Sequence, residues 1–78
     1  MKSMTCKQLG GACDEVFSAA TFEEMAELSQ QHGMQMHQAK DEAHLAAMQA
    51  MQSLMQDPEK MQAWFEARRA EFEALPDN

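Results

Sequence analysis

The stretch CKQLGGAC, residues 6–13, decides the fold, because its two cysteines enclose a turn built on consecutive glycines. The residues on either side, 2–7 and 15–17, have the rough alternation and apolar content of paired strands. Six residues separate the cysteines, which is too many for a tight two-residue turn. We therefore expect a hairpin over residues 1–20 whose loop forms a knuckle.

Helix start signals divide the remainder of the chain. Thr21 and Glu24 have the spacing of a capping box, in which each side chain accepts a hydrogen bond from the backbone at the other residue. Asp57 and Pro58 are typical of a second kind of start, a capping carboxylate followed by proline at the first helical position. The predicted helices span residues 21–39, 41–56 and 58–75. The fold class is therefore α+β, with a short N-terminal metal-knuckle β-hairpin followed by three α-helices.

Length and charge limit the classes of function. The 78 residues form a single domain, 1–78, and the net charge is −7, from 13 acidic and 6 basic residues. Nucleic-acid binding needs a basic face to neutralise phosphates, so we expect no nucleic-acid partner and no anionic membrane surface. No apolar run has the length of a signal peptide or a membrane span. We therefore expect a cytoplasmic protein, in which thiols stay reduced.

Four side chains have the donor chemistry of a metal site. Cys6 and Cys13 supply two thiolates from the knuckle, and His32 and His37 supply two imidazoles from the end of the first helix. This donor set suits tetrahedral Zn²⁺, with another transition metal as the alternative. The histidine spacing is within the usual range for structural zinc, whereas the cysteine spacing is wider than usual. The competing interpretation is that the cysteines are buried apolar residues and the histidines are polar surface.

Helix geometry tests the predicted pair of histidines. Residues five positions apart on an ideal helix lie about 140° apart in rotation. His32 and His37 can therefore share an ion only if the helix loosens or ends between them. Gly33, directly after the first histidine, provides the backbone freedom for such a distortion.

The same residues resemble a small prokaryotic domain-of-unknown-function family, number ten fifty-nine. Its short members are sometimes labelled small metal-binding proteins. The resemblance covers about residues 4–40 and depends on the paired cysteines, the Thr-x-Glu-Glu helix start and the paired histidines. It implies the same four ligands and no defined cellular role. Two positions depart from the family pattern, since Ala12 replaces an acidic residue and Gln38 replaces a glycine.

Two weaker metal interpretations involve neighbouring residues. His37, Asp41 and His44 would share one stripe if the first two helices were continuous, which would give a second metal face. One helix supplies few ligands, however, and Asp41 has the position of a helix cap, so we expect His44 to be a solvent-exposed helix residue. Met34, Met36 and His37 form a run of soft ligands for copper(I), although the methionines elsewhere in the chain favour core packing.

Nine methionines are unusual for this length. An apolar stripe on the second and third helices either packs as a helix–helix core or a dimer seam, or forms a binding surface for a peptide or a second copy. Apolar residues at helical spacing more often form core. The candidate interaction surface consists of Met48, Met51, Met55, Met61, Trp64 and Phe65.

The sequence therefore predicts a non-enzymatic metal-binding protein with structural zinc. No nucleophile–base pair, phosphate-binding glycine loop or open metal position indicates an enzyme. The first alternative is a Met-rich helical module that binds a peptide or forms a homodimer. A lesser alternative is metal storage or delivery, which requires an exchangeable ion.

Overall fold

Two short strands and three helices make up the part of the chain that the computed structural model describes, residues 1–77. The α+β class predicted from the sequence, a hairpin followed by three helices, is confirmed. In chain order the elements are β1 (Lys2–Thr5), the single-turn 3-10 helix η1 (Lys7–Leu9), β2 (Val16–Ala19), α1 (Phe22–Gln38), α2 (Glu42–Met55) and α3 (Pro58–Ala74).

The two strands pair antiparallel, with Lys2 opposite Ala19 and Thr5 opposite Val16. Their pairing continues into the loop, where the Cys6 amide donates to the Glu15 carbonyl at 2.8 Å. The loop between the strands therefore returns on itself as a knuckle that contains η1. Phe17 and the last residue of β2 point into the core, while the alternate residues of β2 are exposed, as the two-residue period of a strand requires.

Side-chain caps start each of the three helices. Thr21 accepts from the Glu24 amide, and Asp57 accepts from the first amides of α3, with Pro58 at the first helical position. Both caps were predicted. The Glu24 carboxylate accepts from the Ala20 amide at 3.4 Å, which is one residue before the predicted partner. Asp41 caps α2 by accepting from the His44 amide at 3.0 Å.

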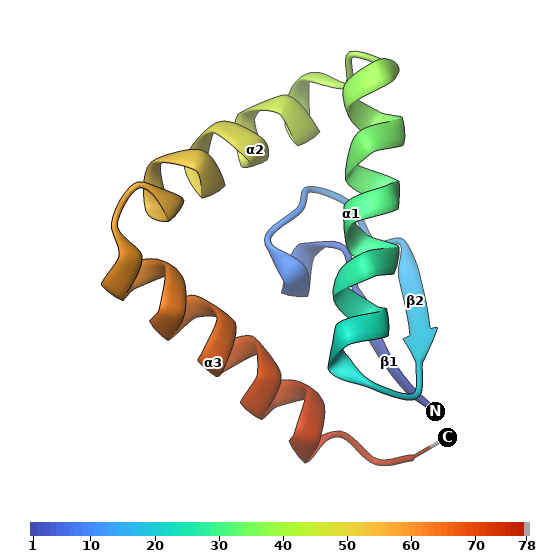
Figure 1. Cartoon of the computed structure of the whole chain (residues 1–78). Coiled ribbons are helices and arrows are strands. Elements are labelled where there is room, and N and C mark those ends of the chain that lie inside the picture. The colour runs from blue at the N-terminus through green and yellow to red at the C-terminus, as the bar shows by residue number, and fades with distance from the viewer. Residues whose placement is uncertain (78) are drawn as a thin grey trace.

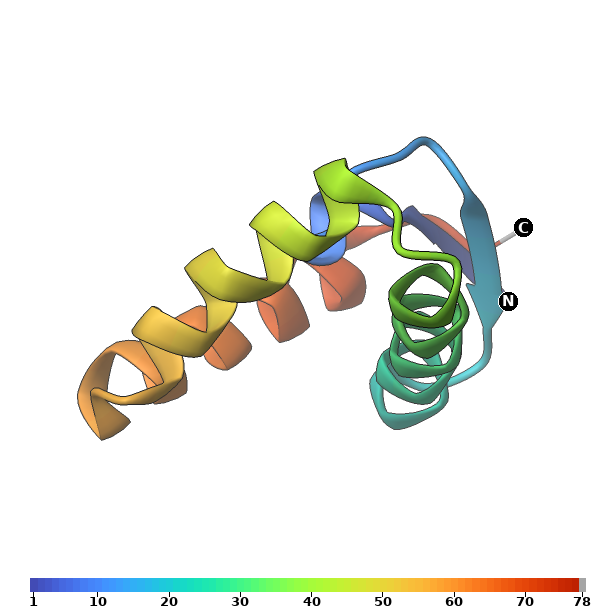
Figure 2. The same cartoon turned by 90° about the horizontal axis from the view of Figure 1, so that it is seen from above.

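The helices form three sides of a triangle with η1 inside it (Figure 1). Figure 2 shows that the strands lie beside α1, far from the corner where α2 meets α3. The buried core accordingly belongs to the hairpin, the first turns of α1 and the end of α3. Phe22 of α1 and Phe72 of α3 meet edge to face, 6.0 Å between ring centroids. The buried apolar residues are Met4, Cys6, Leu9, Phe17, Ala19, Phe22, Met25 and Phe72.

An ion pair adds to the contact between α1 and α3. The Arg69 guanidinium lies 2.9 Å from the Glu23 carboxylate and over the Phe22 ring.

In residues 1–77 no helix is both long and apolar enough to span a membrane.

Candidate metal centre

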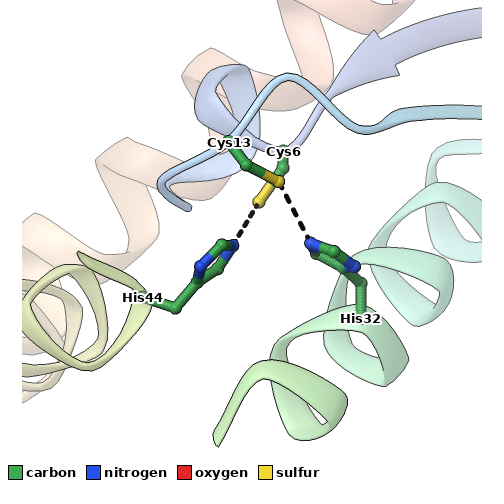
Figure 3. Close-up of side chains that lie close together, drawn as sticks. All are labelled: Cys6, Cys13, His32 and His44. Atoms are coloured by element: carbon green, nitrogen blue, oxygen red, sulfur yellow. Dashed lines mark hydrogen bonds between the residues drawn. The ribbon is translucent and has the colours of Figure 1, made fainter. Parts of the chain in front are cut away.

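Four side chains, two from the knuckle and one each from α1 and α2, converge where these parts of the chain meet (Figure 3). They are Cys6, Cys13, His32 and His44, and one donor atom from each lies within 4.8 Å of all the others. The two cysteines are free thiols. This group has the chemistry to hold a metal ion.

The knuckle backbone sets the positions of both sulfurs. The Lys7 amide donates to the Cys13 carbonyl at 3.0 Å, and the Gly11 amide donates to the Cys6 carbonyl at 2.8 Å. A Cβ atom at Gly11 would lie 2.1 Å from the Cys6 sulfur, so no larger residue fits here. The glycine thus allows the chain to turn directly over the Cys6 side chain.

Backbone amides also tune the two thiols. Burial would raise the pKa of Cys6, but the amides of Cys13 and Ala12 and the His44 imidazole stabilise its thiolate, and the pKa is lowered overall. At Cys13, the amide at Glu15 favours the thiolate. Burial and the adjacent Cys6 oppose this effect and leave the pKa of Cys13 raised. The pKa values of the two thiols are therefore shifted in opposite directions, as expected for two like groups that share a site.

His32 comes from the middle of α1. Its Nε2 lies 3.2 Å from the Cys13 sulfur, and its ring packs against Phe17 of β2 with 5.5 Å between centroids. The imidazole is half-buried. Because this contact joins α1 to the hairpin, the ring orientation is fixed by the same packing that forms the core.

His44 comes from the first turn of α2 and is 5% exposed. Its Nε2 lies 3.6 Å from the Cys6 sulfur, and its Nδ1 contacts the Asp41 carboxylate at 2.6 Å. That hydrogen bond raises the pKa of His44, against the effect of burial, and Cys6 adds to it. The same hydrogen bond lowers the pKa of Asp41. A carboxylate on one ring nitrogen leaves the other nitrogen directed at the thiols, which is how histidine ligands are usually oriented in metal sites.

The structure brings together three of the four residues predicted as ligands and leaves His37 outside the group. Helix α1 continues through Gly33 to Gln38, so the expected distortion does not occur and His37 points to a different side of the helix from His32. His37 is exposed. The fourth place in the group belongs to His44, whose predicted exposure to solvent is wrong.

Two signals in the sequence pointed to His44. The 140° separation already argued against the pair His32 and His37 on a regular helix. Asp41 precedes His44 by one helical turn, which is the spacing of a carboxylate that orients a histidine. What the sequence could not supply was the angle between α1 and α2, which decides whether His44 reaches the knuckle.

Two sulfur–nitrogen distances within the group are close to those of a tetrahedral zinc site. Zn–S bonds of about 2.3 Å and Zn–N bonds of about 2.0–2.1 Å separate sulfur from nitrogen by about 3.5–3.6 Å. The two sulfur–nitrogen distances are 3.6 Å for Cys6 with His44 and 3.2 Å for Cys13 with His32. The donor atoms of these two pairs thus lie within a few tenths of an ångström of the tetrahedral spacing.

The six residues of the candidate interaction surface lie away from the core. None of them is buried, and Met55 and Phe65 are exposed. Met48, Met51 and Met55 line one cavity, while Trp64 and Phe65 line a neighbouring one. Their side chains therefore do not form a closed helix–helix core within one chain.

No family model, curated protein or solved structure matches this chain. The resemblance of residues 4–40 to the small metal-binding family remains a prediction.

Proposed function

We propose that this chain is a non-enzymatic zinc-binding protein in which Cys6, Cys13, His32 and His44 hold one structural Zn²⁺ ion. One observation carries the proposal: two thiols and two imidazoles, brought together from three separate parts of the fold, have their donor atoms within 4.8 Å of one another. The resemblance to a small metal-binding family points in the same direction.

The donor set favours zinc over other ions. Two sulfurs and two imidazole nitrogens in a tetrahedral arrangement are typical of zinc, whereas hard cations such as Mg²⁺ or Ca²⁺ prefer oxygen ligands. Two thiolates neutralise the charge of the ion, so the buried site carries no net charge. Reduced thiols are required, which fits the predicted cytoplasmic location.

Four protein ligands favour a structural role. They fill the tetrahedron, so no coordination position remains for water or a substrate. The ion would join the hairpin, α1 and α2 in a chain that buries few apolar side chains. A domain of this size gains much of its stability from such a crosslink. Metal storage or delivery is the alternative, and it predicts an ion that exchanges while the helices persist.

Metal content of purified variants tests the ligand set. Protein prepared without a metal-affinity column should contain one Zn²⁺ per chain by native mass spectrometry. Cys13→Ser and His44→Gln each remove a donor and should lose the ion. His37→Gln is the matched control, because it makes the same chemical change outside the group and should retain a full complement of zinc.

Two results would overturn the proposal. A folded wild-type protein without metal would mean that the thiols and imidazoles serve only packing. Loss of zinc in His37→Gln with retention in His44→Gln would restore the ligand set predicted from the sequence. Circular dichroism of each variant shows whether a lost ion reflects a lost donor or a lost fold.

A further inference from the structure

The α2–α3 arm of the triangle lacks a covered apolar face. From Leu45 to Glu71 no side chain is buried, although this segment contains leucines, methionines, a tryptophan and a phenylalanine. The single buried side chain of α2 is His44, and that of α3 is Phe72 near its end. Amphipathic helices gain most of their stability by burying such a face, so this arm requires a partner surface.

A continuous groove follows the inside of the triangle. A cavity of about 610 Å³ between α1, α2 and the knuckle shares Gly33, His37 and Met48 with a cavity of about 420 Å³. The 610 Å³ cavity also shares Met51 and Met55 with a third cavity, of about 300 Å³, that reaches α3. Three large apolar residues on this groove are exposed: Met34 by 60%, Met55 by 44% and Phe65 by 37%.

No aspartate, glutamate, lysine or arginine lines any part of this groove. The chain carries 19 charged side chains, the sum of 13 acidic and 6 basic residues, and none falls within residues 28–39 or 43–56. These two segments are the second half of α1 and nearly all of α2. An acidic molecule thus presents one neutral, Met-rich surface.

The shape of the chain also indicates a missing layer. Its extents are 33 × 29 × 15 Å, so it is a plate about half as thick as it is wide. The accessible surface is 5315 Å² for 8.8 kDa, against about 4,800 Å² for a compact monomer of that mass. The radius of gyration is 12.4 Å, where a compact chain of this length has about 11.5 Å. Two plates stacked on one face would form a body of nearly equal dimensions.

We infer that the groove is the interface of a homodimer, in which two copies meet through the uncharged faces of α1 and α2 around a twofold axis. Charge selects this partner. Two copies of an acidic protein repel each other everywhere except on a neutral surface, and a basic peptide would have no carboxylate to pair with in the groove. A twofold arrangement would place the exposed Met34 and Met55 of one copy against the groove of the other.

The inference does not depend on the identity of the metal. It predicts an unusual response to salt, because added salt screens the repulsion between acidic copies while apolar contacts are unaffected or strengthened. The dimer should therefore tighten as salt is raised. An interface built on ion pairs would weaken.

Sedimentation velocity of the metal-loaded protein over a concentration series tests the inference. Wild type should convert from monomer to dimer with rising concentration, with a lower dissociation constant at higher salt. Met34→Glu and Met55→Glu introduce a carboxylate into the interface of each copy and should weaken dimerisation by more than about tenfold. Both side chains are exposed in the monomer, so the fold should persist. Val16→Glu makes the same change in charge at an exposed apolar residue outside the groove and should leave the dissociation constant unchanged.

Three outcomes would overturn the inference. Wild type that stays monomeric at about 1 mM would show that the groove holds no second copy with useful affinity. A dimer that both groove variants leave intact would place the interface elsewhere. A dimer weakened equally by Val16→Glu would reflect total charge and not the groove. Metal content measured on the same samples keeps a failed dimer separate from a failed zinc site.

Discussion

Asp41 has two roles at the level of the single side chain. One carboxylate oxygen accepts from the His44 amide and from the His44 ring, so it starts α2 and orients a candidate ligand at the same time. The contact with the ring, at 2.6 Å, is the shorter of the two. In zinc sites such a partner fixes the tautomer and increases the basicity of the ligand.

Asp41→Asn separates these roles. Asparagine caps a helix as well as aspartate, so α2 should form, but the neutral amide is a weaker partner for the ring. We expect the affinity for Zn²⁺ to fall by about 10- to 100-fold, measured by competition with a chromophoric chelator. Asp57→Asn is the control, because Asp57 caps α3 by the corresponding contact with the amide three residues on, that of Lys60. Equal affinities for wild type and Asp41→Asn would show that the carboxylate only caps the helix.

At the scale of single residues, three of the four members of the candidate metal centre could be predicted from the sequence. Cys6, Cys13 and His32 could be selected because donor type and turn glycines are local properties of the chain. The choice between His37 and His44 depended on the angle between α1 and α2, which is set by the turn that joins them. Lys40, with φ of 57°, forms that turn in a left-handed conformation that the sequence did not predict for a lysine.

At the scale of elements, two glycines have opposite consequences for substitution. Gly11 lies in the knuckle, where a Cβ atom would overlap the Cys6 sulfur, whereas Gly33 lies in the middle of α1, where a Cβ atom would meet the Met48 methyl at an ordinary 3.5 Å. The first glycine is required for the close approach of backbone to sulfur. The second only weakens its helix.

Gly33→Ala should therefore increase the free energy of unfolding by about 0.5–1 kcal/mol, measured by urea denaturation of the metal-loaded protein. Gly11→Ala should lower both stability and zinc content, because the Cys6 thiolate has to move. A destabilised Gly33→Ala would mean that α1 bends at this position after all. Unchanged zinc in Gly11→Ala would show that the knuckle tolerates an alternative path.

The helices could be predicted from the sequence because the residues that start them are local signals. Thr21 and Asp57 act as caps in the way their spacing predicts. The distortion of α1 that a shared site for His32 and His37 would require does not occur, because one glycine lowers helix stability by only about 1 kcal/mol and intact neighbouring turns outweigh that effect. A metal site inferred from residues five apart on a helix needs stronger evidence for a distortion than a glycine.

At the scale of the whole molecule, the candidate metal centre lies between the hydrophobic core and the α2–α3 arm. The core draws on β1, β2, α1 and Phe72, and α2 contributes to the buried interior only through His44. An ion at this centre would join α2 to the knuckle through His44, and that bond would be lost on its removal. The other apolar side chains of α2 are all at least partly exposed.

Hydrogen exchange after treatment with a strong chelator should report this division. We expect backbone amides of α2 to lose protection first and most, with β1, β2 and the first turns of α1 next. Readdition of Zn²⁺ should restore the original pattern, because the binding free energy is linked to folding. If the protection of each amide is the same before and after chelation, the ion is not structural, and exchangeable storage is favoured.

The differing exposure of the methionines, described above for the groove, has a chemical consequence. Met4 and Met25 are 2% and 0% exposed, whereas Met34 and Met55 present their thioethers to solvent in a single chain. Peroxide converts an accessible thioether to a polar sulfoxide, and a buried one reacts only when the protein opens. Oxidation would therefore reach the groove methionines, together with the exposed Met1, before those of the core. The same reaction that leaves the fold intact would replace an apolar surface with a hydrophilic one.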